Sequence, residues 1–493
     1  MKENKNASSI LMPKPVSIID KKGSLRITSE TGISCPTIFD HVRQLVLDQF
    51  SFTSKKTLIT FIHNEKLSNE EYYLEISEDM ITIEASNSTG IYYGMQTVRQ
   101  LMISCDNDVP CCSIKDKPKY PWRGFMIDCS RHFSTIKELK KMIDVAAMHH
   151  LNVFHWHLTD DQSWRLQIPS LPLLTEVGAR RQHVNYEVEV IEEDYYTEED
   201  VLELVEYAKC RYIDIVPEIE FPGHVRALLA SYPEYGCQGK NYKVQAHWGI
   251  FEEVLCVGND SLIPFITEIL TYVAKIFPSK YIHIGGDECP TAAWEKCPKC
   301  QQKMKELNFS KTNQLQSYIT SEICKIVDGL NKIPIGWDEV LDGTEALGLP
   351  ESLIIMSWRG TAGGIKASAL NHKVIMCPNT EGCYFDYKNF DSKEEPGNIG
   401  VTTIEDVTNY SPISDEMNKH QEDMVLGGQG NVWTEKIPFG KNLEYMTFPR
   451  LSVLAERLWN PQALDSVDER RDYLTDRLRK LDINCYTGPS SKK

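Results

Sequence analysis

Two adjacent carboxylates, Asp287 and Glu288, are the residues of this sequence best placed to do chemistry. They end the segment His283-Ile284-Gly285-Gly286-Asp287-Glu288, in which a short apolar stretch runs into two glycines. Glycines let the backbone turn sharply and approach other groups closely. Adjacent side chains at such a turn can point in different directions, so one carboxyl can protonate a leaving group while its neighbour contacts another part of the ligand. A solvated acidic turn is the plain alternative.

Other polar and aromatic residues also come directly after apolar segments of strand length. Carboxylates and histidines can transfer protons, arginine presents several hydrogen-bond donors, and tryptophan offers a flat apolar face. Their regular placement favours one shared site over a set of unrelated solvated turns. These residues are Arg131, His132, Asp160, Asp161, Glu218, His224, Trp337, Asp338, Trp358, Trp433 and Glu435.

Eight short apolar segments separated by helix-length stretches must position these side chains. Thr135 and Glu138 form a capping-box pattern at the start of one intervening helix, and Thr197 can cap another. This alternation predicts an α/β fold, a (β/α)8 TIM barrel, whose C-terminal strand ends converge on the active site. The predicted strands are residues 124–128, 152–158, 212–217, 281–285, 333–337, 353–358, 373–377 and 425–429.

A smaller α+β accessory domain is predicted ahead of the barrel. Residues 56–65 contain a strand-like apolar run, and residues 72–76 and 81–85 alternate as in a hairpin. After Gly90 the apolar spacing becomes helical. The segment 104–121 is polar, contains proline and lacks periodicity, so a boundary is placed near Lys119. The predicted domains are residues 1–118 and, for the catalytic barrel, 119–485.

Several motifs in a fixed order carry a family resemblance between about residues 120 and 460. Together with the segment ending in Asp287-Glu288, they make the chain similar to glycoside hydrolase family 20, the β-N-acetylhexosaminidases. The accessory unit resembles that family's N-terminal domain less specifically. The motifs are Arg123-Gly124-Phe125-Met126-Ile127-Asp128, Ser130-Arg131-His132-Phe133, His155-Trp156-His157-Leu158-Thr159-Asp160-Asp161-Gln162, Pro217-Glu218-Ile219-Glu220-Phe221-Pro222-Gly223-His224, Trp337-Asp338-Glu339, Ser357-Trp358, Tyr384-Phe385-Asp386 and Asn431-Val432-Trp433-Thr434-Glu435.

The resemblance implies an exo-acting retaining hydrolase that removes terminal non-reducing N-acetylhexosamines, GlcNAc or GalNAc, by substrate-assisted catalysis. This mechanism is an exception to the two-carboxylate scheme, because the substrate's acetamido oxygen attacks the anomeric carbon and forms an oxazolinium intermediate. By the same resemblance, Glu288 would be the general acid and then the base. Asp287 would orient the acetamido N–H, Asp161 and His224 would form a relay to Glu288, and Tyr384 would bond the acetamido carbonyl.

By the resemblance, a second group of residues would bind the sugar. Core packing for the tryptophans and surface charge for the others are the alternative explanations. Tryptophans are often core residues, but sugar C–H faces stack on aromatic rings, and the family encloses its sugar this way. The charged members of the group would bind hydroxyls. The residues are Trp337, Trp358 and Trp433 for the aromatic box and Arg131, Asp386 and Glu435 for the hydroxyls.

Two other readings remain open from the sequence. A retaining glycosidase with an enzyme nucleophile would need a second carboxylate on another strand, for which Glu218 or Glu339 could serve. A silent sugar-binding barrel would lack an acid or relay residue, yet all the implied ones are present.

No cofactor or metal is expected for the reaction. Cys297 and Cys300 form one Cys-x-x-Cys without a second pair or histidine at ligand spacing, which is weak evidence for zinc. They are interpreted as loop thiols. The 15 scattered cysteines indicate reduced thiols rather than a disulfide framework.

Length, composition and net charge exclude some classes of binding partner. At 493 residues, 41% hydrophobic and 25% charged, the chain is typical of a globular protein with one large and one smaller domain. A net charge of −17 argues against nucleic acid and anionic membrane surfaces, and no apolar stretch reaches the ~18 residues of a membrane span. The expected partners are N-acetylhexosamine-terminated oligosaccharides or glycoconjugates, with the oligomeric state open.

Because the N-terminus lacks a signal-like apolar core, a cytoplasmic location is expected, with export after signal removal as the alternative.

Overall fold

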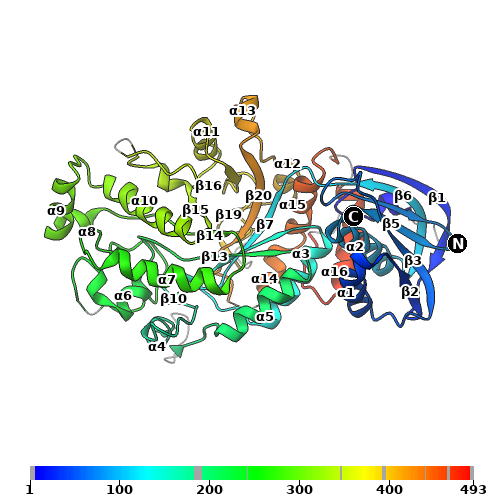
Figure 1. The fold of residues 1–493 in the computed structure, drawn as a ribbon, viewed down its shortest axis with the longest axis horizontal. Helices are drawn as coiled ribbons and strands as arrows, with labels where there is room; N and C mark the ends of the chain where they lie inside the picture. The colour runs from blue at the N-terminus through cyan, green and yellow to red at the C-terminus, as the bar shows by residue number, and fades with distance from the viewer. Residues whose placement is uncertain are drawn as a thin grey trace.

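A six-stranded sheet at one end of the chain adjoins a closed barrel (Figure 1). The structure is a computed structural model that describes residues 6–182, 191–240, 242–344, 347–390, 396–438, 440–463 and 467–488. In the described residues, no helix is both long and apolar enough to span a membrane.

The N-terminal sheet has the strand order β1-β6-β4-β5-β3-β2. Strands β4 and β5 pair antiparallel, and their alternating burial matches the predicted hairpin. The apolar spacing after Gly90 forms α2 (Ser88–Ser104), whose first turn is capped by Asn87, since its side chain accepts a hydrogen bond from the Gly90 N–H at 3.1 Å. The strands are β1 (Ser17–Arg26), β2 (Thr31–Ser34), β3 (Lys56–His63), β4 (Tyr72–Ile76), β5 (Ile81–Ala85) and β6 (Asp108–Asp116), with α1 at Asp40–Phe50.

The prediction that residues 104–121 are an aperiodic polar segment is wrong for Asp108–Asp116, which form β6. Strand β6 lies inside the sheet and pairs antiparallel with both β1 and β4. Val109, Cys111, Cys112 and Ile114 are buried there, because reduced cysteine behaves as a small apolar residue. Cysteines, a proline and polar residues leave this segment without the aliphatic pattern by which strands are predicted.

Eight parallel strands close the predicted barrel in the order β13-β14-β15-β16-β17-β20-β7-β8. Each coincides with one of the eight predicted segments. The strand β7 is buried at every position, as expected for parallel strands covered by helices on the outside. The bounds are β7 (Trp122–Asp128), β8 (Val153–His157), β13 (Asp214–Glu218), β14 (Tyr281–His283), β15 (Ile333–Trp337), β16 (Ile354–Ser357), β17 (Val374–Met376) and β20 (Val425–Val432).

Helices flank the barrel, and both predicted caps are present. Thr135 and Glu138 form a capping box on α3, and Thr197 caps α5 together with Asp200. The longer helices are α3 (Ile136–Met148), α5 (Glu198–Lys209), α6 (Arg226–Ser231), α7 (Leu262–Ile276), α9 (Pro298–Glu306), α10 (Gln314–Gly329), α11 (Ala362–Ala369), α12 (Ile404–Asn409), α14 (Gly440–Thr447), α15 (Arg450–Trp459) and α16 (Val467–Lys480).

Short elements lie in the connections between the longer ones. They are the helical turns η1 (Ala7–Ser9), η2 (Thr37–Phe39), η3 (Pro233–Tyr235), η4 (Asp338–Leu341), α4 (Leu173–Glu176), α8 (Ala292–Lys296) and α13 (Lys419–Glu422), and the strands β9 (Thr159–Asp160), β10 (Ser163–Trp164), β11 (Arg181–Gln182), β12 (Ile191–Glu192), β18 (Tyr387–Lys388) and β19 (Asn398–Val401).

The C-terminal helices join the two parts of the molecule. Figure 1 shows α16 beside α2, close to the N-terminal sheet. The indole N–H of Trp459, at the end of α15, donates to Asp116 Oδ1 of β6 at 2.9 Å. Sheet and barrel are thus held by buried polar contacts as well as by apolar packing.

Candidate active site

A sharp turn after β14 positions the two adjacent carboxylates. Gly285 and Gly286 have φ angles of +67° and +99°, in the left-handed region that favours glycine. A Cβ on Gly285 would lie 1.8 Å from Glu220 Oε2, so no larger residue fits without displacement. The turn brings Asp287 and Glu288 to the wall of a pocket at the C-terminal ends of the barrel strands.

The pocket is a cavity of about 270 Å³. Its volume lies near the lower end of small-ligand sites, about 300–1,000 Å³, which suits one sugar unit. Of the catalytic and sugar-binding residues implied by the family resemblance, all line it except Asp161, which contacts His224 behind the wall. His132, Asp160, Glu218 and Asp338, which also follow strands, lie outside the lining. The lining residues are Arg131, His224, Asp287, Glu288, Trp337, Trp358, Tyr384, Asp386, Tyr387, Asn398, Ile399, Trp433 and Glu435.

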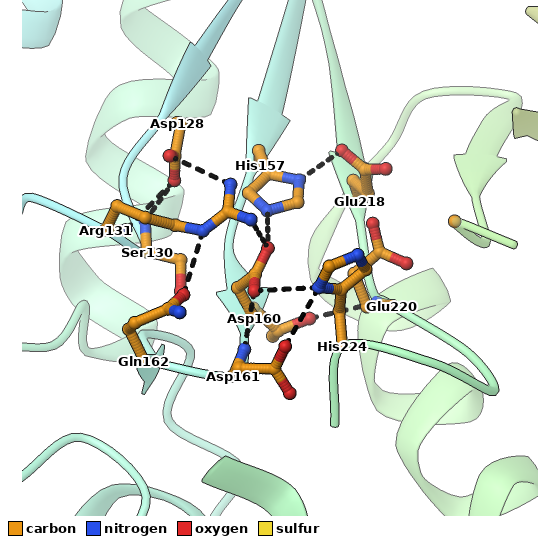
Figure 2. Close-up of polar contacts among 12 residues, drawn as sticks. Asp128, Ser130, Arg131, His157, Asp160, Asp161, Gln162, Glu218, Glu220 and His224 are labelled. Atoms are coloured by element: carbon orange, nitrogen blue, oxygen red, sulfur yellow. Dashed lines mark hydrogen bonds and ion pairs between the residues drawn. The ribbon is translucent and has the colours of Figure 1, made fainter. Parts of the chain in front are cut away.

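His224 lies between two pairs of carboxylates. On one side its Nδ1–H contacts Asp161 Oδ2 at 3.0 Å and Asp160 Oδ1 at 3.2 Å (Figure 2). On the other side its Nε2 lies 3.5 Å from Glu288 Oε2 and 3.7 Å from Asp287 Oδ2. Asp161 is itself held by the backbone N–H of Arg226 at 3.0 Å. The distances therefore place His224 between Asp161 and Glu288, as the predicted relay requires.

Charge stabilises His224 as a cation. Burial alone would lower the pKa of His224, but Asp160, with hydrogen bonds to Asp161 and Glu288, raises that pKa well above its usual range. Burial raises the pKa of Asp287, and the nearby cation on His224 opposes that rise. The site thus places one fixed positive charge beside the two carboxyls that follow β14.

Arg131, which lines the pocket, is fixed by three partners. Its guanidinium pairs with Asp160 Oδ2 at 2.7 Å and Asp128 Oδ2 at 3.2 Å, and its Nε–H donates to Gln162 Oε1 at 2.9 Å (Figure 2). Burial would raise the pKa of Asp160, but Arg131 and His224 together lower it far below its usual range. A guanidinium held this rigidly can present its remaining donors to ligand hydroxyls.

Aromatic rings from four strand ends form the walls. The rings of Trp358 and Tyr384 stack with centroids 6.1 Å apart, and those of Trp337 and Trp433 lie 5.9 Å apart at 45°. The Tyr384 backbone pairs with Asn431 of β20, which fixes the loop after β17 against the barrel. Such walls suit the apolar faces of a sugar and a small methyl group.

A polar corner of the pocket, formed by Asp386, Glu435 and Asn398, includes a residue outside the sequence motifs. Asn398 of β19 donates to Asp386 Oδ2 at 3.1 Å and to Glu435 Oε2 at 3.3 Å. Burial, with the charge of Glu435, raises the pKa of Asp386 to about 8. Asn398 and Ile399 come from a short strand pair that no motif indicated, whereas Tyr387 directly follows a recognised motif and could have been noticed.

Two domain matches to family models identify the family. Residues 120–462 match "Glycosyl hydrolase family 20, catalytic domain", and residues 8–117 match "Glycosyl hydrolase family 20, domain 2". The chain belongs to glycosyl hydrolase family 20. Its enzyme class is therefore that of a glycoside hydrolase.

Named relatives agree with the family. A β-hexosaminidase of Porphyromonas gingivalis is 39% identical over 432 residues, which cover 85% of this chain and 53% of that protein. One from Vibrio furnissii is 32% identical, covering 91% and 76% respectively. The chain thus spans about half of the first relative and three quarters of the second.

A solved structure extends the likeness to the fold. The family 20 exo-β-N-acetylglucosaminidase from Vibrio harveyi, in complex with N-acetylglucosamine, has a TM-score of 0.89 and 29% sequence identity. The match covers 98% of this chain and 79% of that one. The predicted barrel with its N-terminal domain is confirmed.

The two alternative carboxylates of this family 20 chain lie outside the pocket lining. Glu218 is fully buried, and the Trp337 indole N–H donates to its Oε1 at 2.7 Å while His283 Nδ1 lies 2.9 Å from the same oxygen. Glu339 accepts a hydrogen bond from the Trp358 indole at 2.9 Å. Burial, with the charge of Asp287, raises the pKa of Glu339 to about 9. Both carboxyls support the tryptophan walls from behind.

Proposed function

We propose that the protein is an exo-acting retaining β-N-acetylhexosaminidase that uses the substrate's own acetamido group as nucleophile. The observation that carries this proposal is Asp287. Its Oδ1 is buried and has no hydrogen-bond partner among the described residues, although it lines the pocket next to Glu288. A buried acceptor without a partner is costly unless a ligand supplies a donor. The acetamido N–H of an N-acetylhexosamine is such a donor.

In the proposed mechanism, each chemical step is assigned to a residue of the pocket. Glu288, whose side chain is 35% exposed, gives its proton to the glycosidic oxygen as the bond to the anomeric carbon breaks. The acetamido carbonyl oxygen, oriented by the Tyr384 hydroxyl, attacks that carbon from the opposite face. Asp287 accepts the N–H and stabilises the positive charge of the oxazolinium. Glu288 then removes a proton from water, which opens the ring with retained configuration.

The position of the enzyme carboxylates supports the same mechanism. A glycosidase with its own nucleophile needs a second carboxyl about 5–5.5 Å from the acid, facing the sugar. Glu218 and Glu339 contact tryptophan indoles outside the pocket lining. An internal nucleophile already attached to the substrate also avoids much of the entropic cost of attack.

The polar corner and Arg131 support exo action and the substrate class. Asp386 Oδ1 is buried without a hydrogen-bond partner in the described chain, and Arg131 and Glu435 line the same small cavity. These groups would bind the hydroxyls of one terminal sugar. We expect release of single GlcNAc or GalNAc residues from the non-reducing ends of oligosaccharides or glycoconjugates. The N-acetylglucosamine complex of the V. harveyi enzyme supports a GlcNAc substrate.

Trapping experiments test the nucleophile. The enzyme should hydrolyse an aryl N-acetyl-β-glucosaminide but not the matching β-glucoside, which lacks the acetamido group. A thiazoline mimic of the oxazolinium should bind much more tightly than N-acetylglucosamine, because a catalytic site complements its transition state. Mass spectrometry during turnover, or after exposure to a 2-fluoro glycoside, should find no glycosylated protein. A covalent adduct on Glu218, Glu339 or another carboxyl would overturn the mechanism.

A further inference from the structure

We propose that Cys237, Cys256, Cys297 and Cys300 bind a structural zinc ion as a tetrathiolate site. Their four Sγ atoms all lie within 4.8 Å of one another. Three of the S···S distances are 3.6 Å for Cys256–Cys297, 3.7 Å for Cys256–Cys300 and 3.8 Å for Cys237–Cys300. No other group of four cysteines is brought together in the described chain.

These distances fit a tetrahedral metal site and not a disulfide. A zinc–sulfur bond of about 2.3 Å with tetrahedral angles places neighbouring sulfurs about 3.8 Å apart. A disulfide brings two sulfurs to about 2.05 Å and leaves no room for one sulfur to have two partners at equal distance. Cys256 has two such partners, and Cys300 also has two. Four thiolates in a tetrahedron select zinc or iron over Mg²⁺ or Ca²⁺, which prefer oxygen ligands.

The backbone around the four cysteines is fixed by close contacts. Cys297 precedes Pro298, the first residue of α9, and Cys300 lies within that helix rather than in a loop. The Cys256 N–H donates to the Tyr235 carbonyl at 2.7 Å. Gly258 passes so near α9 that a Cβ would lie 2.2 Å from the Lys299 carbonyl carbon.

Burial also fits a closed structural site. Cys256, Cys297 and Cys300 are buried and Cys237 is half-buried. An ion bound by all four sulfurs would therefore be largely shielded from water. None of the four lines the sugar pocket. A closed site with four protein ligands has no open position for substrate, which separates structural from catalytic zinc.

The site joins the two connections that carry catalytic groups. Cys237 and Cys256 lie in the connection after β13, which also carries His224, and the other pair lies in the connection after β14, which carries Asp287 and Glu288. The Trp294 indole N–H donates to the Leu255 carbonyl at 2.8 Å and links the same two segments. Figure 1 shows α8 and α9 at the end of the molecule away from the N-terminal sheet. A zinc ion there would clamp these connections where the sheet gives no support.

Metal analysis of the whole protein tests the site. Protein produced in zinc-supplemented medium and passed over a desalting column should contain one zinc per chain by elemental analysis. Cys256→Ser and Cys300→Ser should lose that zinc. Cys324→Ser should keep it, because Cys324 is a buried cysteine on α10 outside the cluster. A mercurial thiol reagent added to the native wild-type protein should release the zinc in proportion to modified thiols, which gives a result even if the serine variants do not fold.

Three outcomes would overturn the proposal. These are native protein without stoichiometric metal and with all four thiols open to alkylation, stoichiometric iron in place of zinc, and a disulfide between any two of the four in unreduced peptide maps. The zinc count does not depend on hydrolytic activity, so it stands or fails separately from the proposed reaction.

Discussion

Asp287 and Glu288 are neighbours in the chain, but their surroundings differ. The Asp287 side chain is 12% exposed and that of Glu288 35% exposed, and His224 lies within 3.7 Å of both. The buried carboxyl suits contact with one fixed group of the substrate. The more exposed one can exchange protons first with the leaving group and then with water.

Glu288→Gln should lower kcat/KM by about 10²–10⁴-fold, the usual contribution of general acid–base catalysis. The loss should be largest for substrates with poor leaving groups, because an activated aryl leaving group departs with little help from a proton. Steady-state kinetics on a series of aryl N-acetyl-β-glucosaminides, with circular dichroism to verify folding, would measure this. An equal loss across the series, with bond cleavage shown to be rate-limiting, would exclude Glu288 as the acid.

The sequence predicted those site residues that belong to motifs at strand ends. Ten of these line the cavity, and Asp161 lies directly behind it. Asn398 and Ile399 could not be predicted in this way, because they reach the pocket from β19, which lies in the connection between β17 and β20 and does not directly follow a barrel strand. The sequence indicated Asp160 only as a polar residue that directly follows a predicted strand. Its role as the shared partner of Arg131 and His224 depends on distances that spacing cannot give.

At the scale of elements, the turn after β14 sets the catalytic geometry. Gly285 lies against Glu220 of the connection after β13, and Gly286 lies against Val340 of η4. Because glycine has no side chain, the ends of β13, β14 and β15 can approach one another at these two positions. The glycine pair was visible in the sequence, but the residues that it accommodates were not.

Gly285→Ala should lower kcat/KM by about 10²-fold, since a displacement near 1 Å at a catalytic group costs about that much. The added Cβ would meet Glu220 Oε2 at 1.8 Å, and the left-handed backbone would strain alanine by about 1–2 kcal/mol. Gly329→Ala is the matched control, because its Cβ meets nothing within 4 Å at the end of α10. Normal kinetics in folded Gly285→Ala protein would show that the turn tolerates a side chain.

Periodicity predicted the barrel strands better than the N-terminal sheet. Parallel barrel strands are buried on both faces and appear as continuous apolar runs, as β7 does. The strands β1 and β6 have no such run. Along β1 most residues are exposed, and the apolar face of β6 contains cysteines and a proline. β1 and β6 form by pairing with each other across about 90 residues of sequence. A local sequence pattern cannot predict such a long-range pairing.

Across the whole molecule, a buried ion pair joins the N-terminal segment to the last two helices. Glu456 of α15 accepts hydrogen bonds from Arg470 of α16 at 2.7 Å and from the backbone N–H of Lys14 at 2.7 Å. Arg470 also donates to the Leu11 carbonyl at 2.8 Å. Both charged side chains are almost fully buried, so each depends on the other for compensation. This contact ties residues far apart in sequence at the junction between sheet and barrel.

Glu456→Gln should therefore destabilise the entire chain and leave the chemistry intact. Removing one charge of a buried pair leaves the guanidinium uncompensated and costs about 3–5 kcal/mol of unfolding free energy. We expect a lower Tm by calorimetry with one unfolding transition for sheet and barrel, and an unchanged kcat/KM below that transition. Glu30→Gln is the control, because it breaks an exposed pair with Lys55 whose contribution should be small. If the sheet unfolded in a separate early transition while the barrel kept its original Tm, the junction would not couple the two parts. The Glu456–Arg470 pair would then stabilise only its own helices.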